Sequence, residues 1–116
     1  LLDELSVPLI KLGSGEVTNK PLLRHVASFG RPIVLSTGMS TLEEVRRALG
    51  WITDADPECP VVALHCPSQY PASVDDVNLN AMQTMADVAT GISAFRAACL
   101  IITVRSGRPF ARASRT

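Results

Sequence analysis

The sequence has few cysteines and no long apolar run. No stretch approaches the roughly 20 consecutive apolar residues of a transmembrane helix, and no basic-then-apolar signal segment opens the chain. The three cysteines, Cys59, Cys66 and Cys99, are an odd number without CxxC spacing, which argues against a disulfide framework or a zinc knuckle. These absences favour a reduced, cytoplasmic setting and a protein with no membrane partner.

Acidic residues are absent from the C-terminal part of the chain. Residues 92–116 contain five arginines and no acid, a net charge of +5, whereas residues 1–91 contain eleven acidic and six basic side chains, a net charge of −5. Such a tail is typical of segments that bind nucleic acid or anionic membrane, so a non-catalytic binding or interaction fragment is one hypothesis. A nucleic-acid partner ranks below a small-molecule site, because the motifs described below favour the latter.

The chain is 116 residues long and 47% hydrophobic, which allows one domain at most and excludes disorder by composition. Its first five residues, Leu-Leu-Asp-Glu-Leu, resemble the interior of a helix. We therefore expect the chain to begin inside a longer protein.

Four short apolar runs each lead into a polar side chain, at intervals of 25, 29 and 28 residues. A strand, a helix and two loops need about 30 residues, and buried parallel strands are near-continuous apolar runs. The spacing therefore predicts four parallel strands with polar groups at their C-terminal ends, where α/β barrels carry their reactive groups. The runs are residues 8–10 before Lys11, 32–35 before Ser36, 60–64 before His65 and, more weakly, 88–92 before Ser93.

Helices are predicted between these runs. Pro21 marks the start of the first helix and Gly30 its end. Ser40 and Glu43 have capping-box spacing at the start of the second helix, and a third helix is expected from about Asn78. The order βαβαβαβ corresponds to about four units of an eight-stranded (β/α)₈ TIM barrel, with a four-stranded doubly wound sheet as the alternative. We assign residues 1–93 to the partial barrel and residues 94–116 to an anomalous basic tail outside the repeat.

The segment after the first run combines a cation, a hydroxyl and a carboxylate in Lys11, Ser14 and Glu16. Lysine binds phosphate as a point charge, serine adds a donor, and a carboxylate can orient a sugar hydroxyl or act as a base. A solvated Lys–Glu pair at a strand-end turn is the alternative. A further alternative is an aldolase that uses Lys11 as its Schiff base.

Two other loops carry candidate groups. Ser36 opens the segment Ser-Thr-Gly-Met-Ser, whose hydroxyl and N–H groups can hold a phosphate or simply cap a helix. His65 is a ligand, a base or a hydrogen-bonded core residue, and Cys66 is interpreted as an inert core residue. Tyr70 either contacts a substrate or anchors its loop.

Five motifs in residues 1–93 are long and specific. They are Lys-Leu-Gly-Ser-Gly-Glu at 11–16, Ala-Ser-Phe-Gly-Arg-Pro-Ile-Val-Leu-Ser-Thr-Gly-Met at 27–39, Leu-His-Cys-Pro-Ser-Gln-Tyr-Pro at 64–71, Asp-Val-Asn-Leu at 76–79 and Gly-Ile-Ser at 91–93. Together they resemble the sialic acid synthase family. The resemblance implies a TIM barrel in a cytoplasmic homodimer that condenses phosphoenolpyruvate with N-acetylmannosamine or a related N-acetylated sugar. The products are N-acetylneuraminate, or another nonulosonic acid, and phosphate.

Glu16 is the candidate catalytic residue, because its carboxylate can act as a base. The resemblance assigns roles to individual positions and places a catalytic Glu of the family in early barrel strands that this chain lacks. Some positions match residues that hold phosphoenolpyruvate, and others match residues that contact the sugar. The phosphoenolpyruvate-binding positions are Lys11, Ser14, Ser36, Ser93 and, near the phosphate, Ser68; the sugar-contacting positions are Glu16 and Tyr70.

A divalent metal, Mn²⁺ or Mg²⁺, is implied for the complete enzyme, where it polarises the sugar aldehyde. The family's Ser-Asp-His-Thr metal segment is replaced here by Ser93-Ala94-Phe95-Arg96, and its later Glu-x-His segment is missing. We therefore expect no metal ligand in this chain, which alone should be inactive. Residues 94–116 are interpreted as a frame-shifted translation or a divergent tail, which the other reading frames of the coding DNA would distinguish. The resemblance does not distinguish between several kinds of family member: sialic, legionaminic and pseudaminic acid synthases, and spore-coat polysaccharide relatives.

Overall fold

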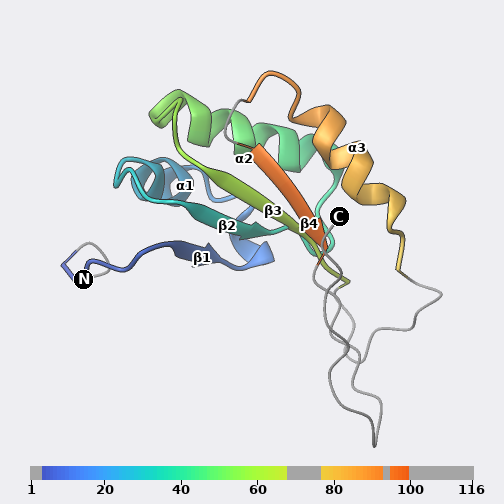
Figure 1. Cartoon of the computed structure of the whole chain (residues 1–116), viewed down its shortest axis with the longest axis horizontal. Helices are drawn as coiled ribbons and strands as arrows, with labels where there is room; N and C mark the ends of the chain where they lie inside the picture. The colour runs from blue at the N-terminus through green and yellow to red at the C-terminus, as the bar shows by residue number, and fades with distance from the viewer. Residues whose placement is uncertain (1–3, 68–76, 93–94, 100–116) are drawn as a thin grey trace, which may run out of the picture.

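Strands and helices alternate along the chain in the computed structural model (Figure 1), which describes residues 4–67, 77–92 and 95–99. The elements are β1 (Ile10–Leu12), a 3₁₀ turn (Ser14–Glu16), α1 (Lys20–Ala27), β2 (Ile33–Ser36), α2 (Leu42–Ala55), β3 (Val61–His65), α3 (Asn80–Val88) and β4 (Phe95–Cys99). None of the helices within the described ranges is long and apolar enough to cross a membrane.

The four strands form one parallel sheet in chain order, β1-β2-β3-β4. Because crossovers between parallel strands are right-handed, an order that never reverses places every connecting helix on the same face. Figure 1 shows the three helices together on one side of the sheet, where α2 packs against both α1 and α3. A doubly wound sheet reverses its strand order and carries helices on both faces. The structure therefore confirms the barrel-type arrangement and excludes the doubly wound alternative.

Alternate residues of each strand face the helices and the open side of the sheet. On β1 and β2, Ile10, Ile33 and Leu35 are buried under the helices, whereas Lys11 is exposed and Val34 is half-buried on the opposite face. Burying a Leu or Ile side chain contributes about 1.5–3 kcal/mol. The helix-covered face therefore forms the core of the described residues, and the open face corresponds to the side that a closed barrel turns inward.

The first two helices follow from their terminal signals, with one correction. In α1, the Asn19 side chain caps the helix, and Gly30 adopts φ +65° just beyond it, as predicted. The capping box of α2 is Thr41 with Glu44, one residue later than predicted. Both registers satisfy the sequence motif, and the helix that follows buries a stripe formed by Val45, Ala48, Leu49 and Ile52.

Two strand predictions are wrong in position. β1 begins at Ile10, two residues after the expected start, so Lys11 lies inside the strand rather than beyond it. The run over residues 88–92 is not a strand, because Val88 ends α3 and Gly91 follows in a turn at φ +96°. The fourth strand is instead β4, in a segment that the sequence pattern assigns to the basic tail. Helix α3 begins at Asn80, two residues after Asn78.

Candidate functional site

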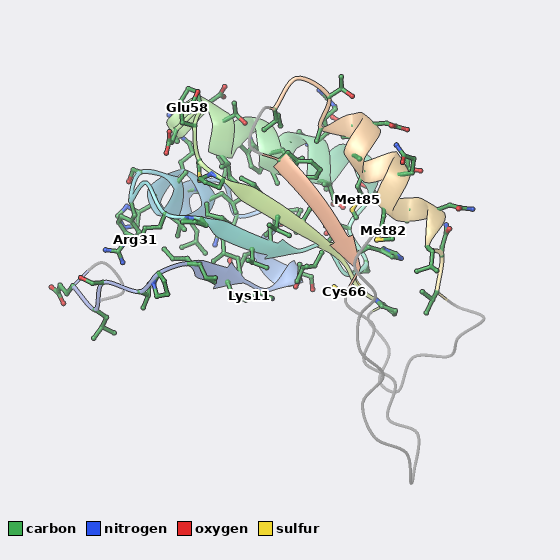
Figure 2. The ribbon with its side chains drawn as sticks, viewed as in Figure 1. Lys11, Arg31, Glu58, Cys66, Met82 and Met85 are labelled. Atoms are coloured by element: carbon green, nitrogen blue, oxygen red, sulfur yellow. The ribbon has the colours of Figure 1, made fainter. Side chains whose placement is uncertain are left out.

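Polar side chains follow or end the strands at one edge of the sheet. Lys11 pairs in register with Val34, and Ser36 pairs with Leu64. Because side chains alternate along a strand, Lys11 and Ser36 both project on the open face, on neighbouring strands. In Figure 2, Lys11 and Cys66 are labelled at this edge of the sheet. The structure thus brings together two residues that are 25 positions apart in the sequence.

These side chains line a cavity of about 270 Å³, which we call the strand-end cleft. Ser36 is only 6% exposed, because the end of β2 is enclosed by its neighbours, whereas Ser14 is half-buried on the 3₁₀ turn. Within the described part of its lining, Lys11 is the one charged side chain. The described lining consists of Lys11, Gly13, Ser14, Ser36, Gly38, Cys66 and Pro67.

The cation and the glycines give the strand-end cleft its chemical character. The Lys11 Nζ atom donates a hydrogen bond to the carbonyl oxygen of Leu12 at 3.0 Å, and the side chain is otherwise exposed. Gly38 has φ +50°, a conformation in which any other residue except Asn or Asp is strained. A cation, two serine hydroxyls and the backbone turn at Gly38 suit a small anion such as a phosphate ester or carboxylate.

Glu16 does not line the strand-end cleft. Its Oε2 atom accepts a hydrogen bond of 2.7 Å from Asn19 Nδ2, and the Asn19 Oδ1 atom in turn accepts from the Leu22 N–H at 3.3 Å. The carboxylate therefore supports the N-terminal cap of α1 in this structure. The catalytic role of Glu16 is not tested by this geometry and stays a prediction.

Three predicted site residues, Ser68, Tyr70 and Ser93, lie outside the described residues. Their assignment to phosphoenolpyruvate or the sugar stays a prediction. For Ser93, the strand that was expected to lead into it is absent, and β4 begins only at Phe95.

A second cavity, also of about 270 Å³, lies on the helix side of the strand ends, and we call it the rear cavity. His65 faces this side because it follows Ala63 by two positions on β3. The His65 Nε2 atom is buried and has no hydrogen-bond partner among the described residues. The described lining consists of Thr37, Gly38, Ser40, Leu42, Val45, His65, Asn78, Ala81, Thr84 and Met85.

Gly38 lines both cavities, so the turn after β2 forms a wall between them. Thr37 fastens this turn to β3, since its backbone N–H and its Oγ1 atom both donate to the Leu64 carbonyl oxygen at 3.0 Å. Sequence reasoning left His65 open between three roles and did not identify this shared wall. Strand alternation alone, counted back from His65 to Ala63, would have placed the imidazole on the helix side.

The two cysteines that the structure describes are both free and buried. Cys59 is 2% exposed, and burial, assisted by the nearby Asp56 carboxylate, raises the pKa of its thiol to about 11. Cys66 lines the strand-end cleft at 9% exposure.

A metal centre does not fit the described part of the chain. No group of three or more His, Cys, Asp or Glu side chains among residues 4–67, 77–92 and 95–99 is arranged to hold an ion. Neither cavity has a carboxylate in its described lining, and hard divalent cations such as Mg²⁺ and Mn²⁺ prefer oxygen ligands of that kind. We therefore derive no chemical step through a metal on these residues.

An unreversed parallel sheet, helices on one face and a cleft at the strand ends define a fragment of a TIM-barrel enzyme. The NeuB family profile matches residues 1–99, and the chain belongs to this family. The match extends through β4. The boundary drawn at residue 93 and the frame-shift interpretation of the tail stay predictions.

Similar proteins support this assignment. The N,N'-diacetyllegionaminic acid synthase of Legionella pneumophila is 48% identical over 89 residues, which cover 74% of this chain and 25% of the relative. The chain thus spans about a quarter of the length of the curated relatives it matches.

Two solved structures resemble the fold. The spore coat polysaccharide biosynthesis protein SpsE of Bacillus subtilis matches with a TM-score of 0.71 at 28% identity, over 76% of this chain and 24% of its own. The N-acetylneuraminic acid synthetase of Leptospira borgpetersenii, in complex with citrate, matches with a TM-score of 0.70 at 26% identity. The match covers 90% of this chain and 42% of the synthetase chain. Both are TIM-barrel enzymes, so the four strands described here are a fragment of such a barrel.

Proposed function

We propose that this chain supplies the phosphoenolpyruvate-binding part of a synthase that joins phosphoenolpyruvate to N-acetylmannosamine or a related N-acetylated sugar. In this reaction the enol carbon attacks the open-chain sugar aldehyde, water adds to the cationic centre that results, and phosphate leaves. The product is N-acetylneuraminate or another nonulosonic acid. The relatives are named for different products, a legionaminic acid in one and N-acetylneuraminic acid in another, so the sugar of this protein is open.

The strand-end cleft is the observation that carries the proposal. Lys11 supplies a positive charge, Ser14 and Ser36 supply hydroxyl donors, and the cavity of about 270 Å³ suits a small anion. The Leptospira synthetase crystallised with citrate, itself a carboxylate anion. An anion-binding cleft at this edge is consistent with a substrate that carries both a phosphate and a carboxylate.

The exposure of Lys11 favours anion binding over the Schiff-base alternative. A Schiff-base lysine needs a neutral amine, which enzymes obtain by desolvation in an apolar pocket or beside a second cation. Lys11 is exposed, and the described lining of the cleft contains no second cation. Its ammonium group instead acts as a hydrogen-bond donor to Leu12 O.

The remaining parts of the reaction are proposed for the complete protein. We place Glu16 and Tyr70 at the sugar, with Ser68 and Ser93 near phosphoenolpyruvate. We also propose that the residues that bind a divalent metal, and those that form the interface of a homodimer, lie in segments beyond the described residues. The isolated chain should therefore bind phosphoenolpyruvate without condensing it.

Substitution of Lys11 tests the anion site. Calorimetric titration of the 116-residue chain with phosphoenolpyruvate should show Lys11→Ala weakening the affinity by about tenfold or more, because a charge-assisted hydrogen bond contributes about 1.5–3 kcal/mol. Lys20→Ala is the matched control, since Lys20 lies on α1 with its Nζ atom over the Trp51 ring, outside the cleft.

Equal binding by the two lysine variants would overturn the anion site. Borohydride trapping of a carbonyl compound on Lys11 would favour the aldolase instead. Condensation by the unsubstituted chain alone would show that the active site is complete without other segments.

A further inference from the structure

His65 is a half-buried polar residue that does not line the strand-end cleft, and its Nε2 atom is buried. It ends β3, faces the helix side and lines the rear cavity, while its Nε2 atom has no hydrogen-bond partner among the described residues. A buried nitrogen without a partner costs free energy, and such atoms in native proteins usually bind an ordered water or serve a function. The Nε2 atom without a hydrogen-bond partner therefore indicates that a small polar molecule binds in the rear cavity.

The lining of the rear cavity suits a water molecule. A buried water needs room and two to four polar partners. Besides His65, the buried Thr37 and the half-buried Ser40 line the inner part of a space of about 270 Å³, and the exposed Asn78 and Thr84 lie at its solvent side. The described lining has no charged side chain, so it offers neutral hydrogen-bond partners rather than a site for an ion.

The rear cavity shares the turn after β2 with the strand-end cleft. Gly38 lines both spaces; Ser36 lines the strand-end cleft, while Thr37 and Ser40 line the rear cavity together with His65. Thr37 already binds the Leu64 carbonyl through two hydrogen bonds of 3.0 Å, and the Ser40 N–H donates to Thr37 O at 2.9 Å. A further hydrogen-bonded link from His65 would hold the remaining side of the same turn.

We infer that His65 is a positioning residue whose Nε2 atom hydrogen-bonds a water held at the inner wall of the rear cavity, and that this water holds the Thr37–Ser40 turn so that Ser36 and Gly38 face the strand-end cleft. The inference deepens the proposed function, on which its effect on substrate affinity rests. The water and the turn are physical features that can be measured with or without substrate.

Histidine-selective ¹³C,¹⁵N labelling tests the water directly, because the chain has only two histidines. His65 should show a long-lived contact to water at its Nε2 side, and its ring ¹⁵N shifts should report a hydrogen-bonded Nε2. The exposed His25, whose ring lies edge-on to Phe29 at 4.8 Å, is the internal control and should show only rapidly exchanging water. A hydrogen-bond coupling from His65 Nε2 to another group of the chain would overturn the inference.

Three variants test the positioning role. His65→Leu should raise hydrogen exchange at the Thr37 and Ser40 amides and weaken phosphoenolpyruvate binding about fivefold, the equivalent of one neutral hydrogen bond. His65→Gln carries an amide to about the position of Nε2 and should stay within twofold, as should His25→Leu. A folded His65→Leu with unchanged exchange, or His65→Gln as impaired as His65→Leu, would overturn the inference.

The two proposals fail separately. If neither the unsubstituted chain nor Lys11→Ala binds phosphoenolpyruvate, the proposed function fails, while the water contact and the amide exchange still decide the role of His65. If the phosphoenolpyruvate site is confirmed and His65 shows no bound water, only the positioning inference fails. If His65→Leu does not fold, the water measurement on the unsubstituted chain decides it.

Discussion

At the scale of single residues, burial makes the Cys59 thiol unreactive. Cys59 follows α2 in the chain and is 2% exposed, and its Sγ atom donates weakly to the Arg31 carbonyl at 3.5 Å. Burial keeps the pKa of this thiol at about 11, above the ordinary value near 9. Because the thiolate is the reactive form, Cys59 is a core residue and not a nucleophile.

The raised pKa of Cys59 predicts a loss of stability at alkaline pH. Between pH 9 and pH 11 the unfolded chain has released the thiol proton and the folded chain has kept it, so rising pH favours unfolding. The free energy of unfolding, measured by urea titration, should fall by on the order of 2 kcal/mol more in the unsubstituted chain than in Cys59→Ala over this range. Parallel pH profiles for the two proteins would contradict the assignment.

At the scale of elements, the start of α2 shows that two overlapping capping signals in the sequence give one cap in the structure. The Thr41 Oγ1 atom accepts from the Glu44 N–H at 3.3 Å, and Glu44 Oε2 accepts from the Thr41 N–H at 2.7 Å. These hydrogen bonds lower the pKa of Glu44 from its ordinary value. Glu43, the partner expected from the sequence, instead forms an exposed pair with Arg46 at 2.8 Å.

Two alanine variants distinguish the capping registers. Thr41→Ala should lower the free energy of unfolding by about 1 kcal/mol, the usual cost of losing an N-cap, whereas Ser40→Ala should cost a few tenths. Urea denaturation of both variants at pH 7 measures the difference. Since the folded pKa of Glu44 is depressed, the Thr41 effect should shrink as pH falls through that pKa and the carboxylate is protonated. A larger cost for Ser40→Ala would restore the register expected from the sequence.

At the scale of the whole molecule, the sheet has one covered face and one open face. Leu35 is fully buried beneath the helices, while its neighbour Val34 is half-buried on the open side with Val62 and Leu64. In a closed barrel the open face points inward. One face of this four-stranded sheet therefore packs into a hydrophobic core, and the other face corresponds to the inner wall of a barrel.

Neighbouring substitutions on β2 measure this difference between the faces. Leu35→Ala should cost about 2–5 kcal/mol of unfolding free energy, because it leaves a cavity in a packed core. Val34→Ala should cost less than about 1.5 kcal/mol, because its side chain is only half-buried. Chemical denaturation of the 116-residue chain gives both values. Equal losses would indicate that the open face is covered as well.

The strand and helix pattern was predictable where short-range signals were unambiguous. β2 and β3 lie where continuous apolar runs placed them, and α1 has its predicted proline start and glycine end. The run over residues 88–92 misled because Thr90 and Gly91 end a helix, with the Thr90 Oγ1 atom donating to Asp87 O at 2.7 Å. An apolar run of five residues satisfies a strand and a helix end equally well, and long-range pairing decides between them.

The sequence by itself determined the barrel-type alternation, the polar groups at the strand ends and, through its motifs, the NeuB family assignment. These features depend on local runs and on motif residues that are close in the chain. The tertiary structure decided that Lys11 and Ser36 face one cavity while His65 faces another, with Gly38 between them. Strand register and the positions of the helices set which face each side chain occupies, and both are long-range properties that no single segment contains.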